Sequence, residues 1–181
     1  MKNRLNFFFL ALLLLLRLFC PLLVFFQPMA AIIINYLIDC WDGLIFNKLN
    51  YSIKTYRFVD QIADFYWLTI IFLYLILKNP EPTFFYSFIF FFVLSLAGVT
   101  VFFANRKENH FIFFPNVAEH LFWIYVVSKV FNTPQLIEFP IFGIIILFLT
   151  IIKIFDEYLI HQKNFSLLNT IMRKKILNWK E

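Results

Sequence analysis

The chain has 181 residues, of which 62% are hydrophobic, and its mean hydropathy is +0.78. Soluble domains are about 45–50% apolar, so this composition excludes a soluble domain and indicates an integral membrane protein. The net charge is +5, and contact of basic segments with anionic lipid headgroups explains it without a nucleic-acid partner.

Continuous apolar runs follow one another along the chain, and each is close to the about 20 residues that a helix needs to cross a bilayer core. Their continuity predicts helices, because the strands of a membrane barrel alternate apolar and polar residues. The sequence therefore predicts an all-α integral membrane protein with six transmembrane helices. We place these helices at residues 6–26, 28–46, 62–77, 83–103, 115–132 and 137–155.

The first run lies at the start of the chain and must be distinguished from a secretory signal peptide. It is long, contains Arg17 and Pro21, and has no clear small-residue cleavage site, so we interpret it as a retained first span. Helices are expected to stop at seams between runs where a proline follows a polar residue. These seams are Gln27-Pro28, Asn79-Pro80 and Thr133-Pro134.

Basic residues gather on one side of a chain with six spans: at the N-terminus, after the second and fourth spans, and at the C-terminus. By the positive-inside rule, both termini are predicted to be cytoplasmic, in a multi-pass protein of the plasma membrane. Residues 1–160 are expected to form the transmembrane domain. Residues 161–181 combine apolar side chains with a basic cluster, which predicts a basic amphipathic cytoplasmic tail.

Four of the five aspartates lie in the stretch DCWDGLIFNKLNYSIKTYRFVDQIAD, residues 39–64. Asp39 and Asp42 are at helical spacing near the end of the second span, and so are Asp60 and Asp64 near the start of the third. Because the connection between these antiparallel spans is short, the two pairs can converge at one depth. An ionised carboxylate at membrane depth costs on the order of 2.5–3.5 kcal/mol, so the cluster needs positive charge.

Three basic residues near the connection can supply that charge, although loosely, because they lie in or beside a solvated loop. They are Lys48, Lys54 and Arg57. Divalent cations fit better, since hard oxygen ligands suit Mg²⁺ or Mn²⁺ and two such ions can bridge several carboxylates. A purely structural cluster stays open as the alternative.

The spacing D-x-x-D-G-x-x-F-N, eight residues, then Y-x-x-x-D-x-x-x-D resembles the signature of the CDP-alcohol phosphotransferases. That signature reads D-x-x-D-G-x-x-A-R, eight residues, then G-x-x-x-D-x-x-x-D. All four aspartates and Gly43 fall in register over residues 39–64. The resemblance implies a membrane transferase of phospholipid synthesis, which moves a phosphatidyl group from a CDP-linked lipid donor to a small alcohol acceptor and releases CMP.

The resemblance also implies roles for single residues. Asp39, Asp42 and Asp60 would bind two divalent ions, Mg²⁺ or Mn²⁺, and Asp64 would lie at the same metals and act as the general base. Gly43 would let the nucleotide approach the backbone. The family likeness further implies a CDP-diacylglycerol-like donor, an active site that faces the cytoplasm, and a homodimer.

The nucleotide half of the signature is altered, because Phe46 and Asn47 replace its Ala-Arg and Tyr56 replaces its second glycine. Phe adds bulk, Asn is neutral, and Tyr closes a position where close backbone approach is expected. Three interpretations follow. In the first, the enzyme works normally: Tyr56 stacks on the cytosine or a shifted helix makes room, Lys48 or Arg57 replaces the missing Arg, and Asn47 and Tyr56 remain candidates for nucleotide binding. In the second the donor differs, and in the third the chain is a catalytically silent relative.

Other polar residues interrupt the apolar runs, and we expect them to face the bundle interior or to reach an interface. They are Arg17, Glu119, His120, Lys129 and Lys153. Arg106, Lys107 and Lys153 lie near the cytoplasmic ends of spans four to six and are candidates for holding an acceptor that carries phosphate. The rival class is a small transporter or ion pathway, but polar residues gathered at one level favour the enzyme.

Overall fold

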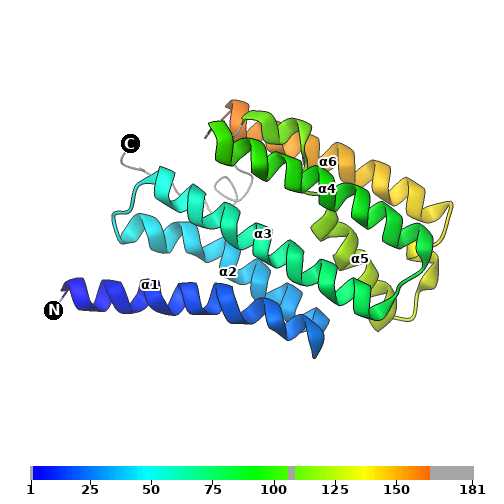
Figure 1. Ribbon diagram of the computed structural model, residues 1–181, viewed down its shortest axis with the longest axis horizontal. Coiled ribbons are helices and arrows are strands. Elements are labelled where there is room, and N and C mark those ends of the chain that lie inside the picture. Colours follow the sequence, from blue (N-terminus) through cyan, green and yellow to red (C-terminus); the bar gives the residue numbers. More distant parts are fainter. Residues whose placement is uncertain (1, 106–108, 164–181) are drawn as a thin grey trace. The chain divides into compact units, whose positions relative to one another are not determined.

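The structure is a computed structural model that describes residues 2–105 and 109–163, and within those ranges it is helical with no strand (Figure 1). Its α-helices are α1 (Lys2–Phe19), α2 (Pro28–Lys48), α3 (Ile53–Lys78), α4 (Pro82–Asn105), α5 (Ala118–Val130) and α6 (Ile141–Lys163). Short 3₁₀ helices join them at η1 (Cys20–Phe25), η2 (Asn109–Phe113) and η3 (Pro134–Ile137). The prediction of an all-α fold is confirmed. Most of the predicted tail, residues 164–181, lies outside the described ranges.

Among the described residues, four helical segments are long and apolar enough to cross a membrane. They are Phe8–Phe25, Pro28–Lys48, Ile53–Lys78 and Pro82–Asn105, and they match the first four predicted spans. α5 has 13 residues, fewer than the about 20 that a spanning helix needs. The apolar helices indicate a membrane protein, while the fifth and sixth spans stay a prediction.

The helices end where the sequence places turn residues. α2 begins at Pro28, directly after the first predicted seam. At the start of α3, the backbone N–H of Thr55 donates to Ser52 Oγ at 3.1 Å, which satisfies a backbone donor of the first turn. The residues with left-handed φ angles after α2, α3 and α5 are Asn50, Asn79 and Asn132, and asparagine tolerates this conformation. All three predicted seams therefore separate helices.

The described residues divide into two compact units, and the division falls inside α3, between Ile70 and Ile71. The first unit contains α1, η1, α2 and the N-terminal part of α3. The second contains the rest of α3 and the elements from α4 to α6. Each unit has its own buried side chains.

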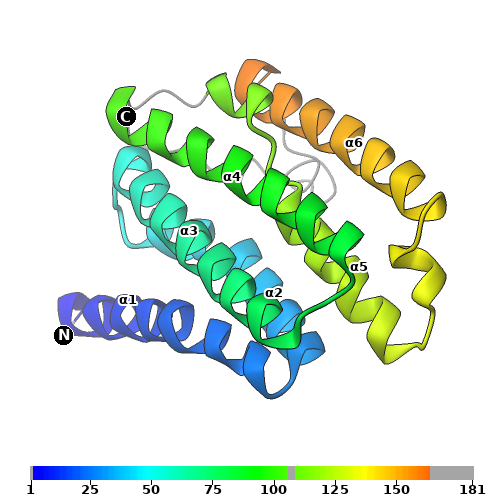
Figure 2. The ribbon, with the colours of Figure 1, turned by 45° about the vertical axis from the view of Figure 1, so that its right-hand side comes forward.

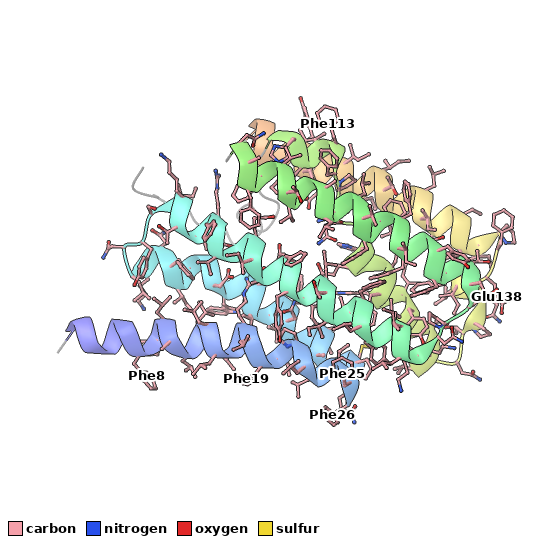
Figure 3. All side chains as sticks on the ribbon, viewed as in Figure 1. Phe8, Phe19, Phe25, Phe26, Phe113 and Glu138 are labelled. Atoms are coloured by element: carbon pink, nitrogen blue, oxygen red, sulfur yellow. The ribbon has the colours of Figure 1, made fainter. Side chains whose placement is uncertain are left out.

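In the first unit, α1 and η1 contact α2 through one stripe of side chains. Leu13, Arg17, Cys20 and Val24 recur every three or four residues and are buried, because such positions share one helical face. From Phe8 onwards, the other faces of α1 are apolar and mostly exposed, as a lipid-facing helix requires. Phe19, labelled in Figure 3, lies on that outer side and is 59% exposed.

The second unit has an aromatic core. Phe84 of α4 stacks on Tyr125 of α5 with 5.0 Å between ring centroids, and it meets Phe142 of α6 at 5.6 Å. Phe72 of α3 stacks on Phe92 of α4 at 4.8 Å. Ring pairs at these distances stabilise packing beyond the burial of their area, so phenylalanine side chains hold the helices of this unit together.

Candidate metal centre

Three helices of the first unit bring four acidic side chains and one basic side chain together. α2 carries Asp39 and Asp42, α3 carries Asp60 and Asp64, and α1 carries Arg17. Figures 1 and 2 show α1 beside α2 and α2 beside α3, with successive helices running in opposite directions. Residues at similar distances from a connecting turn therefore reach the same level, which is how residues far apart in the sequence meet here.

Three of the carboxylates form a compact group. One carboxylate oxygen each of Asp39, Asp42 and Asp60 lies within 4.8 Å of the other two. The expected convergence of the two aspartate pairs is thus found for these three residues. Asp64, on the next turn of α3, does not belong to this group.

Arg17 places its guanidinium at the centre of the cluster. Its Nη2 donates to Asp39 Oδ1 at 2.9 Å, to Asp60 Oδ1 at 3.2 Å, and to Asp42 Oδ2. Its Nη1 lies 3.7 Å from Asp64 Oδ1. One buried cation therefore contacts all four carboxylates, and the planar, multi-donor guanidinium is suited to such contacts.

The four aspartate side chains differ in how much of their surface is exposed, from the most buried, Asp42, to the most exposed, Asp39. The side chain of Asp42 is 3% exposed, that of Asp60 20%, that of Asp64 36% and that of Asp39 49%. Arg17 is nearly as buried as Asp42, with a side chain that is 8% exposed. Because buried charges are costly without partners, Asp42 and Arg17 form the inner pair of the cluster.

Tyr56 fills the space beside Gly43. A Cβ atom added at Gly43 would lie 3.2 Å from the Tyr56 hydroxyl oxygen, so the tyrosine ring packs against the glycine backbone. The same hydroxyl donates to Asp42 Oδ1 at 3.1 Å, and the ring meets Phe46 at 5.5 Å between centroids. The position where the resemblance implies nucleotide approach is thus occupied by an aromatic side chain.

Replacing Tyr56 by phenylalanine is expected to lower the free energy of unfolding by about 1.5 kcal/mol, because buried Asp42 loses a charge-assisted hydrogen bond. The matched control is Tyr66→Phe. The Tyr66 hydroxyl donates to the backbone carbonyl of Leu18 at 3.1 Å in an exposed setting, so its loss should cost no more than about 0.5 kcal/mol. Thermal unfolding of the purified variants in detergent compares the two, and equal losses would contradict the proposed importance of the Asp42 bond.

The remaining predicted site residues have mixed outcomes. Asn47 is half-buried near the end of α2, where its backbone carbonyl accepts from the N–H of Asn50 at 2.9 Å. Arg106 and Lys107 lie outside the described residues. Lys153 belongs to the second unit, and its Nζ lies 3.8 Å from Asp156 and from Glu157 on its own helix.

Arg17 is a source of neutralising charge in addition to the three bases expected near the connection. Lys48 and Lys54 are exposed and Arg57 is half-buried, and the cation that contacts all four carboxylates is Arg17. From the sequence, Arg17 was expected to face the bundle interior or to reach an interface, and no partner was predicted for it. A signal for the pairing existed, because Arg17 and Asp39 lie at similar distances on either side of the turn at Phe26–Gln27, and a charge within a span needs a partner at its own level.

The donor set fits a hard divalent cation, because Asp39, Asp42 and Asp60 offer carboxylate oxygens from two helices within 4.8 Å of one another. Comparison of the chain with protein-family models, with curated proteins and with solved structures found no match. A proposal for the function of the chain must therefore be argued from the residues of this cluster and their geometry.

Proposed function

We propose that the chain is a divalent-cation-dependent membrane phosphotransferase of the CDP-alcohol phosphotransferase type. It would move a phosphatidyl group from a CDP-diacylglycerol-like donor to a small alcohol and release CMP, as a step of phospholipid synthesis. The observation that carries the proposal is the group formed by Asp39, Asp42 and Asp60. These are the three residues to which the signature assigns the metals, and they come from two helices.

Asp39, Asp42 and Asp60, with Asp64 beside them, would hold two Mg²⁺ or Mn²⁺ ions. When bound, such ions neutralise the charge of a diphosphate and stabilise the phosphate that leaves. The donor set supports this choice, since carboxylate oxygens suit Mg²⁺ and Mn²⁺ better than they suit softer metals.

Asp64 would accept the proton of the acceptor hydroxyl. Its side chain is 36% exposed, so an acceptor can reach it. Its place outside the compact group of three supports a role different from theirs. Gly43, Asn47 and Tyr56 would lie toward the nucleotide, with Tyr56 turned away from Gly43.

The proposal includes the finer topology. The protein would have six spans, both termini in the cytoplasm, and a site that opens toward the cytoplasm from the plasma membrane. Residues 1–160 would form the catalytic domain, with 161–181 as a basic tail, and two copies would form a homodimer. Arg106, Lys107 and Lys153 would bind an acceptor that carries phosphate.

A second candidate function is supported by two other observations. Arg17 contacts all four carboxylates, and Tyr56 fills the space beside Gly43. These features are expected of a catalytically silent relative, in which the Arg17 guanidinium permanently takes the place of the metal ions. The two candidates differ in whether divalent ions can take the carboxylates from Arg17.

Purified protein in liposomes with radiolabelled CDP-diacylglycerol, Mg²⁺ or Mn²⁺ and a panel of small alcohols tests the proposal. CMP release is expected with at least one alcohol, and it should require the divalent ion. The Asp42→Asn variant, which removes the innermost carboxylate, should release none. Absence of CMP with every alcohol would overturn the proposal and favour the silent relative.

A further inference from the structure

The charges of the cluster point to a second role for Arg17. Four carboxylates and one guanidinium have a net charge of minus three. Two divalent ions add four positive charges and bring the total to plus one. Binding of metal ions therefore changes the sign of the site, and with it the kind of partner that Arg17 needs.

Arg17 and a divalent ion require the same three carboxylates. Nη2 donates to Asp39 Oδ1, Asp42 Oδ2 and Asp60 Oδ1, and those residues supply the compact group of carboxylates. Two cations held by one set of carboxylates repel each other, so an ion that binds there weakens the contacts of Arg17.

A displaced Arg17 has little access to water. Its side chain is 8% exposed, and a buried guanidinium without an anionic partner is strongly unfavourable. Lys54, which stands on α3 of the same unit, is exposed and stays hydrated with or without a partner. Of these two cations, Arg17 is the one that gains from an anion brought into the site together with the metals.

Resting on the proposed function, we propose that Arg17 exchanges partners: it neutralises the aspartates in the metal-free protein and binds the diphosphate of the donor once metal ions hold the carboxylates. The planar guanidinium matches the oxygens of phosphate as well as those of carboxylate. Arg17 then supplies, from α1, the phosphate-binding charge that neutral Asn47 lacks in α2.

The exchange predicts effects of opposite sign on two ligands. In the Arg17→Gln variant, Mn²⁺ alone should bind at least about tenfold more tightly, because a competing cation is gone. Inorganic pyrophosphate should bind the Mn²⁺-loaded variant about tenfold more weakly, the effect of losing one charge-assisted hydrogen bond. The control Lys54→Gln removes the same charge from an exposed position and should change both affinities by less than about twofold.

Electron paramagnetic resonance of Mn²⁺ and equilibrium binding of radiolabelled pyrophosphate, both on the full chain in detergent, measure the two affinities. If Arg17→Gln does not fold, Arg17→Lys replaces it in both measurements. Lysine keeps the positive charge but lacks the planar guanidinium, so the changes in Mn²⁺ affinity and pyrophosphate affinity should be smaller and again of opposite sign. Unchanged or weaker Mn²⁺ binding in these variants, or equal pyrophosphate binding, would overturn the exchange while leaving the proposed function intact. If neither wild type nor variant binds Mn²⁺, the proposed function fails and the exchange fails with it.

Discussion

Replacing Arg17 by methionine is expected to lower the free energy of unfolding of the metal-free protein by about 3–5 kcal/mol, the cost of removing one partner from a buried ion pair. Methionine preserves apolar bulk within the buried stripe of α1, so the loss reports charge more than packing. Asp42, with a side chain 3% exposed, suffers most. It keeps the hydrogen bond from Tyr56 but has no cation beside it.

Thermal or denaturant unfolding in detergent, with a chelator present, measures this loss. Lys54→Met removes a cation from an exposed position of α3 and should change stability by no more than about 0.5 kcal/mol. Adding Asp42→Asn to Arg17→Met should recover part of the loss, since the unpaired charge is then removed as well. A loss below about 1 kcal/mol for Arg17→Met would contradict the view that this residue holds the cluster together.

The helices were largely predictable from the sequence because apolar runs and turn residues act locally. The proline seams and the asparagines after the helices are read from neighbouring residues alone. The start of α3 was predicted too late, at residue 62 instead of Ile53. The polar residues within 53–61 interrupt the apolar pattern that predicts a span. The helix nevertheless begins earlier, because Ser52 caps its first turn and Asp60 on its inner face has a partner in Arg17.

The candidate site was predictable only in part. The spacing of the aspartates indicated which side chains share a face, since the period of a helix is fixed. The identity of the internal cation was not predictable in this way, because Arg17 and Asp60 are separated by 43 residues and meet only when three helices are assembled. The contact between Tyr56 and Gly43 depends likewise on how α2 packs against α3, and the sequence pattern does not fix that packing.

Two aspartate variants distinguish the proposed general base from the proposed metal ligands. Replacing Asp64 by asparagine is expected to lower the rate of CMP release by about 10²–10⁴-fold, because a positioned general base contributes that much. Mn²⁺ affinity should change little, since Asp64 lies outside the group of three carboxylates. Asp42→Asn should instead lose both CMP release and Mn²⁺ binding, because Asp42 is the innermost member of that group.

The two variants are close isosteres of the residues they replace, so the shape of the site is kept while a charge and a proton acceptor are lost. Glu81→Gln is the matched control, since it removes a carboxylate charge from an exposed position and should leave both measurements unchanged. Full activity of Asp64→Asn would remove the proposed base. Loss of Mn²⁺ binding in both aspartate variants would instead make Asp64 a metal ligand of equal weight, and the acceptor's proton would then need another base in the site.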